Sequence, residues 1–276
     1  MPKEKYRLSA ERFEAYYTAI YGSRWTRLRK ALLADAALIE FSQGLSTPYF
    51  LNHASILAAL ALRMPESGTV LDACAAPGGK SLVIASGLNE GQSLLANELS
   101  SERRGRLARV LDEHLDAEKR QRVCVSGFDA ARLAGQQSEH GRFAGILLDA
   151  PCSSERYVLR NEKSLAEWTN ARPRYLAQRQ WALLSAAFLL LAPGASLVYA
   201  TCAISPEEND GVVSRLMKKY KDEVTLDEPE FKEGERTTFG RLILPDETNG
   251  MGPMYIARAW KNTCVSDTSG CVWHRR

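Results

Sequence analysis

Two cysteines stand directly after apolar runs that are typical of buried strands, where a thiol could do covalent chemistry. Cys152 follows Ile146–Asp149 by two residues, and Cys202 follows Leu197–Thr201. The thiolate of cysteine is a strong nucleophile, whereas a lone cysteine at a strand end is more often a small buried apolar residue. The polar contexts Asp-Ala-Pro-Cys and Tyr-Ala-Thr-Cys favour a catalytic pair over packing. Cys124, inside Val123-Cys124-Val125, lacks such a context and is interpreted as a buried packing residue.

A second candidate site is the glycine-containing segment Val70–Ser81 (VLDACAAPGGKS). It reads as a strand, a tight turn and a helix. Glycine lets the backbone approach a ligand, and a helix N-terminus offers free N–H groups to a carboxylate or phosphate. The spacing matches neither GxGxxG nor GxxxxGK[ST], which disfavours a nicotinamide oxidoreductase and a P-loop protein.

Short apolar runs alternate with helical stretches from residue 69 onward, which indicates βαβ units and a parallel, doubly wound, Rossmann-like α/β sheet. Ligands of such sheets bind beyond the carboxyl ends of the strands, where the candidate residues lie. The predicted strands are Thr69–Ala73, Gln92–Ala96, Arg122–Val125, Gly145–Asp149 and Ser196–Ala200. The predicted helices are Gly79–Ser86, Ser101–Leu115, Ala171–Leu191 and Pro206–Lys219.

The N-terminal part is helical in pattern and differs from the rest of the chain. We expect helices over Ala10–Tyr21, with Ser9 as the N-cap, over Trp25–Leu33 and over Ser55–Leu62. The predicted organisation is a helical appendage over residues 1–66, a catalytic domain over 67–262 and a polar tail over 263–276.

Composition sets broad limits on the function. The chain has 276 residues, of which 45% are hydrophobic and 25% charged, and a net charge of +3, so charge alone neither requires nor excludes nucleic acid. The longest apolar run is too short for a membrane helix and no secretory signal is seen, so we expect a cytoplasmic protein with reduced thiols. Cys264, Cys271 and His274 lack zinc-site spacing, and no metal is expected.

The motifs together resemble the NOL1/NOP2/Sun (RsmB-like) family of RNA 5-methylcytosine methyltransferases. After LDACAAPGGKS come Ala96–Ser100 with Arg103, Asp129, LDAPCS, YATC, LILPD and GPMYI, in the family's order. The resemblance covers about residues 47–260 and is nearest to the short mitochondrial-type members. The Cys152–Arg156 segment (CSSER) departs from the commoner Cys-Ser-Gly-x-Gly form.

The resemblance implies S-adenosylmethionine as the cofactor. Glu98 would accept the ribose hydroxyls, Asp129 the adenine amino group, and Lys80 with the Gly78–Gly79 amides would meet the methionine carboxylate. The full set of implied cofactor residues is Cys74, Ala75, Ala76, Pro77, Gly78, Gly79, Lys80, Glu98, Arg103, Asp129 and Asp149.

The resemblance also divides the catalytic roles. The Cys202 thiolate would add to cytosine C6, Cys152 would assist product release, and Asp149 would help to position the base and cofactor. Two alternatives remain open: a DNA-type methylase in which Cys152 attacks, and an RNA-binding assembly factor without turnover.

RNA is the expected partner, with rRNA ahead of tRNA, and a protein partner for targeting remains open. The segment that contains Pro151 and Cys152 is called the Pro-Cys loop. Basic residues near this loop are the preferred phosphate contacts: Arg156, Arg160, Arg172, Arg174 and Arg179. The basic first thirty residues carry Tyr6, Tyr16, Tyr17, Tyr21 and Trp25, which either stack on bases or dock on the core, with no preference between the two.

Overall fold

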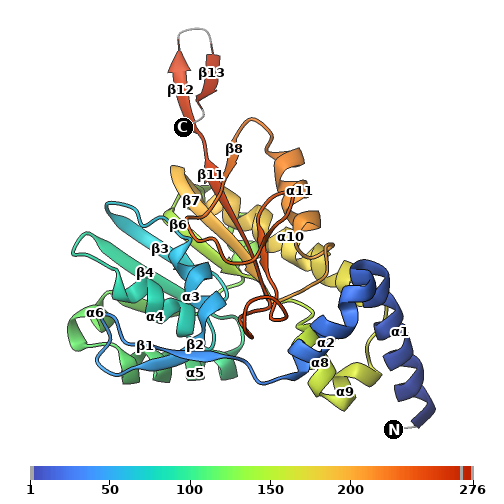
Figure 1. The fold of residues 1–276 in the computed structure, drawn as a ribbon. Coiled ribbons are helices and arrows are strands. Elements are labelled where there is room, and N and C mark those ends of the chain that lie inside the picture. Colours follow the sequence, from blue (N-terminus) through green and yellow to red (C-terminus); the bar gives the residue numbers. More distant parts are fainter. Residues whose placement is uncertain (1–2, 268–269, 275–276) are drawn as a thin grey trace.

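The computed structural model describes residues 3–267 and 270–274, and it contains one large central sheet (Figure 1). The strand order is β5-β4-β3-β6-β7-β11-β10-β9, with β8 also paired to β11. From β5 to β7 all neighbours are parallel, and β11 then runs antiparallel to β7. The predicted mostly parallel, doubly wound α/β fold is therefore confirmed.

The strands of this sheet are β3 Gly68–Asp72, β4 Gln92–Asn97, β5 Val123–Ser126, β6 Phe143–Asp149, β7 Leu191–Thr201, β8 Val224–Asp227, β9 Glu235–Arg236, β10 Arg241–Ile243 and β11 Met254–Lys261. Two separate hairpins pair β1 Leu38–Phe41 with β2 Tyr49–Asn52, and β12 Thr263–Asp267 with β13 Gly270–His274. The helices are α1 Lys3–Tyr21, α2 Trp25–Leu33, α3 His53–Leu60, α4 Gly79–Ser86, α5 Ser101–His114, α6 Ala117–Gln121, α7 Ala130–Leu133, α8 Glu155–Arg160, α9 Glu162–Ala166, α10 Arg172–Leu190 and α11 Asp210–Lys219.

Helices cover both faces of the sheet because successive side chains of its inner strands point to opposite sides. Val70 packs with α3, α4 and α5 on one face, while its neighbour Leu71 packs with α10 and α11 on the other. This burial on both faces explains why the strands appear in the sequence as nearly unbroken apolar runs.

The N-terminal helices α1 and α2 pack beside α8 and α9 at one end of the sheet (Figure 1). Phe13 and Tyr17 are buried there against Trp168 of the segment after α9, and Trp25 is buried against both rings. For Tyr17 and Trp25 the docking alternative is therefore correct, since a buried ring cannot stack on RNA. The expected division of the chain after residues 66 and 262 stays a prediction, although α3 packs with the sheet rather than with α1 and α2.

Three local predictions were wrong. The helix α1 begins at Lys3, so Ser9 lies inside it, where its Oγ donates to the Ala166 carbonyl at 3.0 Å and does not cap the helix. The helix α11 begins at Asp210, because Pro206–Asn209 form turns that carry hydrogen bonds of the site. Cys124 is exposed, since β5 is an edge strand with β4 as its neighbour.

No helix in the part of the chain that the structure describes is both long and apolar enough to cross a membrane.

Candidate active site

The glycine-containing loop connects β3 to α4 at the carboxyl edge of the sheet. Gly78 has a φ of +120°, a conformation that favours glycine, and a Cβ on Gly79 would lie 2.9 Å from the Tyr49 ring. The loop borders a small cavity together with residues from β2, α3 and β6. The lining residues are Tyr49, Leu51, Ser55, Asp72, Cys74, Ala75, Ala76, Pro77, Gly79, Lys80 and Asp149.

Buried carboxylate oxygens without hydrogen-bond partners mark this region as a place for a polar ligand. Asp72 is buried beneath the loop, and its Oδ2 accepts from Ser81 at 2.7 Å while its Oδ1 has no partner. Burial is the main cause that raises the pKa of Asp72 to about 7. An unpaired buried acceptor is costly, so a ligand donor at this position would be favourable.

Glu98 follows the next strand, β4, and Arg103 lies in the first turn of α5. The Glu98 side chain is 5% exposed, and its Oε1 accepts from the Ser100 amide at 2.9 Å. Its Oε2 lies 3.2 Å from Arg103 Nη1, yet has no partner in hydrogen-bond geometry. Arg103 Nη2 donates to the Ala76 carbonyl at 2.9 Å, so it connects α5 to the loop.

Asp129 follows β5 and begins α7, where its Oδ1 accepts from the Ala131 amide at 3.0 Å. Because the carboxyl ends of β3, β4 and β5 lie along one edge of the sheet, the loop, Glu98 and Asp129 lie in sequence along that edge. Glu98 and Asp129 therefore have structural contacts of their own besides the ligand roles expected from the sequence.

The two cysteines meet at the ends of the neighbouring strands β6 and β7. Cys152 Sγ and Cys202 Sγ are 3.0 Å apart, and Ser154 Oγ lies 3.2 Å from Cys202 Sγ. The hydrogen bond from Cys152, opposed by burial and supported by Ser154, lowers the pKa of Cys202. The same contact, together with burial, raises the pKa of Cys152. Cys202 is therefore the more acidic thiol of the pair.

Cys202 faces a cavity of about 550 Å³, a size usual for small-molecule sites. Among the described residues Cys152 does not line it. The lining residues come from the segment before β1, from β2, α3 and α8, and from the start of β11. They are Ala36, Asn52, Ser55, Ser154, Arg156, Tyr157, Arg160, Asn161, Cys202, Gly252, Pro253 and Met254.

Lys80 and Asp149 both line the smaller cavity. Lys80 Nζ donates to Asp149 Oδ2 at 2.7 Å and to Ser55 Oγ at 3.4 Å, and Ser55 lines both cavities. Burial lowers the pKa of Lys80, but the Asp149 charge more than offsets this and the pKa is raised. A positive charge is thus held next to the boundary between the two cavities.

A buried polar network supports the Pro-Cys loop from below. Glu155 accepts from Tyr17 Oη at 2.5 Å, from the Ile204 amide at 3.0 Å and from Ser153 Oγ. Glu208 Oε2 accepts from the Ser153 amide and from Gln180 Nε2, both at 2.9 Å. These contacts connect α1 and both cysteine-bearing segments. Glu155 and Glu208 were not predicted from the sequence as parts of the site, although Glu155, three residues after Cys152, was a visible signal.

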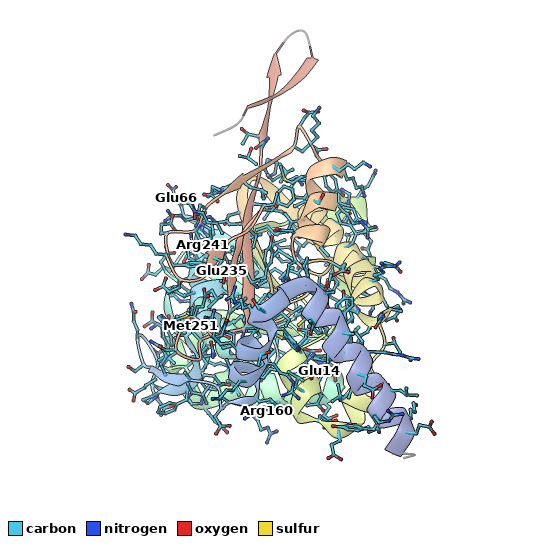
Figure 2. The ribbon with its side chains drawn as sticks, turned by 45° about the vertical axis from the view of Figure 1, so that its right-hand side comes forward. Glu14, Glu66, Arg160, Glu235, Arg241 and Met251 are labelled. Atoms are coloured by element: carbon cyan, nitrogen blue, oxygen red, sulfur yellow. The ribbon has the colours of Figure 1, made fainter. Side chains whose placement is uncertain are left out.

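Two of the arginines expected to contact phosphate have partners within the chain. Arg156 donates to the carbonyls of Ala34 and Gly252, both at 3.0 Å. Arg160, labelled in Figure 2, donates to the Leu33 carbonyl at 3.1 Å and to Asp35 Oδ1 at 2.5 Å. Both guanidinium groups therefore connect α8 to the residues after α2. The side chains of Cys264, Cys271 and His274 lie outside the described residues.

Comparisons with known proteins agree on one family. The family described as 16S rRNA methyltransferase RsmB/F matches residues 59–259. The chain is 33% identical over 241 residues to the 5-cytosine rRNA methyltransferase NSUN4 of Bos taurus, covering 80% of this chain and 62% of that protein. It is 34% identical over 229 residues to the mitochondrial tRNA (cytosine(34)-C(5))-methyltransferase of Danio rerio, covering 77% of this chain and 60% of that protein. The chain thus spans about three fifths of the length of these relatives.

Solved structures agree in fold. The structure of NSun6 from Pyrococcus horikoshii with SFG superimposes with a TM-score of 0.65 at 27% identity, covering 82% of this chain and 55% of that one. A methyltransferase homologue from the same organism gives 0.68 at 21% identity, covering 89% of this chain and 93% of that one.

Proposed function

The chain belongs to the 16S rRNA methyltransferase RsmB/F family, and from this premise we propose that it methylates C5 of a cytosine in RNA, with S-adenosylmethionine as the methyl donor. The observation that carries the proposal is the cysteine pair. Cys202 faces the larger cavity, while the thiol that would supply its hydrogen bond, Cys152, lies 3.0 Å away and outside the cavity lining.

The carboxyl edge of the sheet fits the proposed cofactor. When bound, S-adenosylmethionine would supply an electrophilic methyl group on its sulfonium sulfur. Glu98 Oε2, buried and without a hydrogen-bond partner, suits the ribose hydroxyls. Asp129 suits the adenine amino group, and the Gly78–Gly79 segment at the start of α4 suits the methionine carboxylate. Lys80 would also meet the methionine carboxylate. The proposed binding set is completed by Cys74, Ala75, Ala76, Pro77, Arg103 and Asp149.

In the proposed mechanism Cys202 Sγ adds to C6 of the cytosine, which forms a C–S bond and makes C5 nucleophilic. C5 would then take the methyl group as the methyl–sulfonium bond breaks, with S-adenosylhomocysteine as the leaving group. A base removes the C5 proton, the C–S bond breaks, and Sγ leaves with the electron pair of that bond. Cys152 assists this release, and Asp149, held by Lys80 at the boundary of the two cavities, positions the base.

RNA reaches Cys202 through the larger cavity. A base in a stem must be flipped out to enter such a pocket, which costs less in a loop or at a mismatch. Tyr157 is an exposed aromatic residue at this cavity, and it suits stacking on an unpaired base. We propose rRNA rather than tRNA as the substrate, a role for a protein partner in targeting, and a cytoplasmic location, noting that the Danio rerio relative is named as mitochondrial.

The test uses three serine variants with radiolabelled cofactor and transcripts of small-subunit rRNA and tRNA. Cys202→Ser should abolish methylation and form no covalent complex, because a hydroxyl is a far weaker nucleophile than a thiolate. Cys152→Ser should methylate the base and then accumulate a protein–RNA adduct that survives denaturing electrophoresis. Cys124→Ser, which changes an exposed cysteine on the edge strand, is the matched control and should turn over normally.

The outcomes separate the alternatives. Trapped RNA in Cys202→Ser with none in Cys152→Ser would reverse the roles and make the chain resemble DNA-type methylases. Normal turnover in both variants would refute covalent catalysis by these thiols. RNA binding without methylation of either transcript by the unmodified chain would favour an assembly factor.

A further inference from the structure

We infer that Ser154 is a positioning residue that donates its hydroxyl proton to Cys202 Sγ and so holds this sulfur as a thiolate. The inference rests on the proposed function only for its role in methyl transfer. It starts from the backbone. Ser154 has φ = 53° and ψ = 62°, the left-handed conformation that favours glycine, yet the chain has serine there.

The strained conformation brings the hydroxyl to the sulfurs. Ser154 Oγ lies 3.2 Å from Cys202 Sγ and 3.5 Å from Cys152 Sγ. A serine hydroxyl has one proton to donate, and its contact with Cys202 Sγ is the shorter of the two, which favours donation to Cys202. Cys152 Sγ lies 3.0 Å from Cys202 Sγ and supplies a second donor to that sulfur.

The position of Ser154 also fits this role because it shares the larger cavity with Cys202. Both residues line that cavity, so the hydroxyl lies beside the face of the sulfur that a substrate must approach. Ser154 immediately precedes α8, whose first residue, Glu155, is fully buried and held by Tyr17 and the Ile204 amide. The hydroxyl is therefore attached to a rigid support rather than to a free loop.

Other charged groups around Cys202 act in both directions. Lys80 on α4 and Arg156 on α8 place positive charge near the sulfur, and Asp149 on β6 and Glu155 on α8 place negative charge near it. These opposing charges partly offset one another. Burial disfavours the thiolate of Cys202, and the two short contacts to Cys152 and Ser154 favour it.

The experiment compares Ser154→Ala with Ser154→Gly. Both variants remove the hydroxyl, but glycine also relieves the left-handed strain, so the two should differ in stability and agree in their effect on Cys202. The readout is the pH dependence of iodoacetamide alkylation of the Cys202 peptide, followed by mass spectrometry. We expect the alkylation midpoint of Cys202 to rise by about one pH unit in both variants, a tenfold smaller thiolate fraction below the midpoint.

A second readout is the pH–rate profile of RNA methylation, whose alkaline shift should match that of alkylation. The inference would be overturned if both variants showed the same pH dependence of Cys202 alkylation as the unmodified chain, whatever their methylation activity. A midpoint that shifts in only one variant would indicate a change of loop structure and would also overturn it. Should the unmodified chain methylate neither transcript, the alkylation shift would still support Ser154 while the proposed function fails.

Discussion

Replacing Tyr17 by Phe tests whether α1 stabilises the Pro-Cys loop through a single buried hydroxyl. Tyr17 is fully buried, and its Oη donates to Glu155 Oε1 at 2.5 Å. Hydrogen bonds to charged groups contribute about 1.5–3 kcal/mol. Glu155 keeps two donors, Ser153 Oγ and the Ile204 amide, after the change. We therefore expect an unfolding free energy lower by about 2 kcal/mol, or roughly 4–8 °C in Tm for a chain of this size.

The adjacent Tyr16 provides the matched control. Its Oη is buried near Glu207 and Ser205 without a partner in hydrogen-bond geometry, so Tyr16→Phe removes an equal group and at most a weak polar contact. Chemical denaturation of both variants gives the two free energies, and methylation assays report whether the loosened loop slows the reaction. Equal stabilities of Tyr17→Phe and Tyr16→Phe, within about 0.5 kcal/mol, would refute the reasoning.

Further substitutions test the proposed cofactor residues at the carboxyl edge of the sheet and the buried polar network around Glu208. Glu98→Gln, which keeps an acceptor for the Ser100 amide, should weaken S-adenosylmethionine binding about tenfold or more in calorimetry, because one carboxylate oxygen becomes a donor. Asp129→Asn should also weaken it while keeping the cap of α7, and unchanged affinity in both would contradict the assignment. Burial, ahead of the charge of Glu155, raises the pKa of Glu208 to about 8 from 4.5. The folded state then binds more protons than the unfolded state between these values, so stability should fall as pH rises from about 4.5 to 8. Glu208→Gln should flatten that dependence in thermal unfolding, and a decline as steep as in the unmodified chain would disprove it.

The parallel part of the sheet was predictable because its strands are buried on both faces. Ile146–Leu148 and Leu197–Tyr199 are nearly continuous apolar runs, and α4 was predicted with its observed bounds because the Gly-Gly turn marks its start. The positions of the two cysteines at neighbouring strand ends followed from the same pattern.

Features that depend on long-range pairing were not predictable. Four of the eight residues in β1 and β2 are exposed and only one is buried, and no two-residue turn signal joins the strands, so their sequence looks like a loop. Tyr17 and Glu155 are 138 residues apart in the chain, and no local pattern connects them. Whether β5 lies at an edge depends on strand order, which is why Cys124 was assigned to the interior.

The two strands that precede the cysteines lie inside the sheet, and each has a paired strand on both sides: β3 and β7 for β6, and β6 and β11 for β7. Interior strands of a domain open only with the largest free energies, close to that of global unfolding. The amides of Ile146–Asp149 and Leu197–Thr201 should thus be among the slowest to exchange with deuterium. Heat should then abolish alignment of the two thiols only when the whole sheet melts, without an earlier local transition.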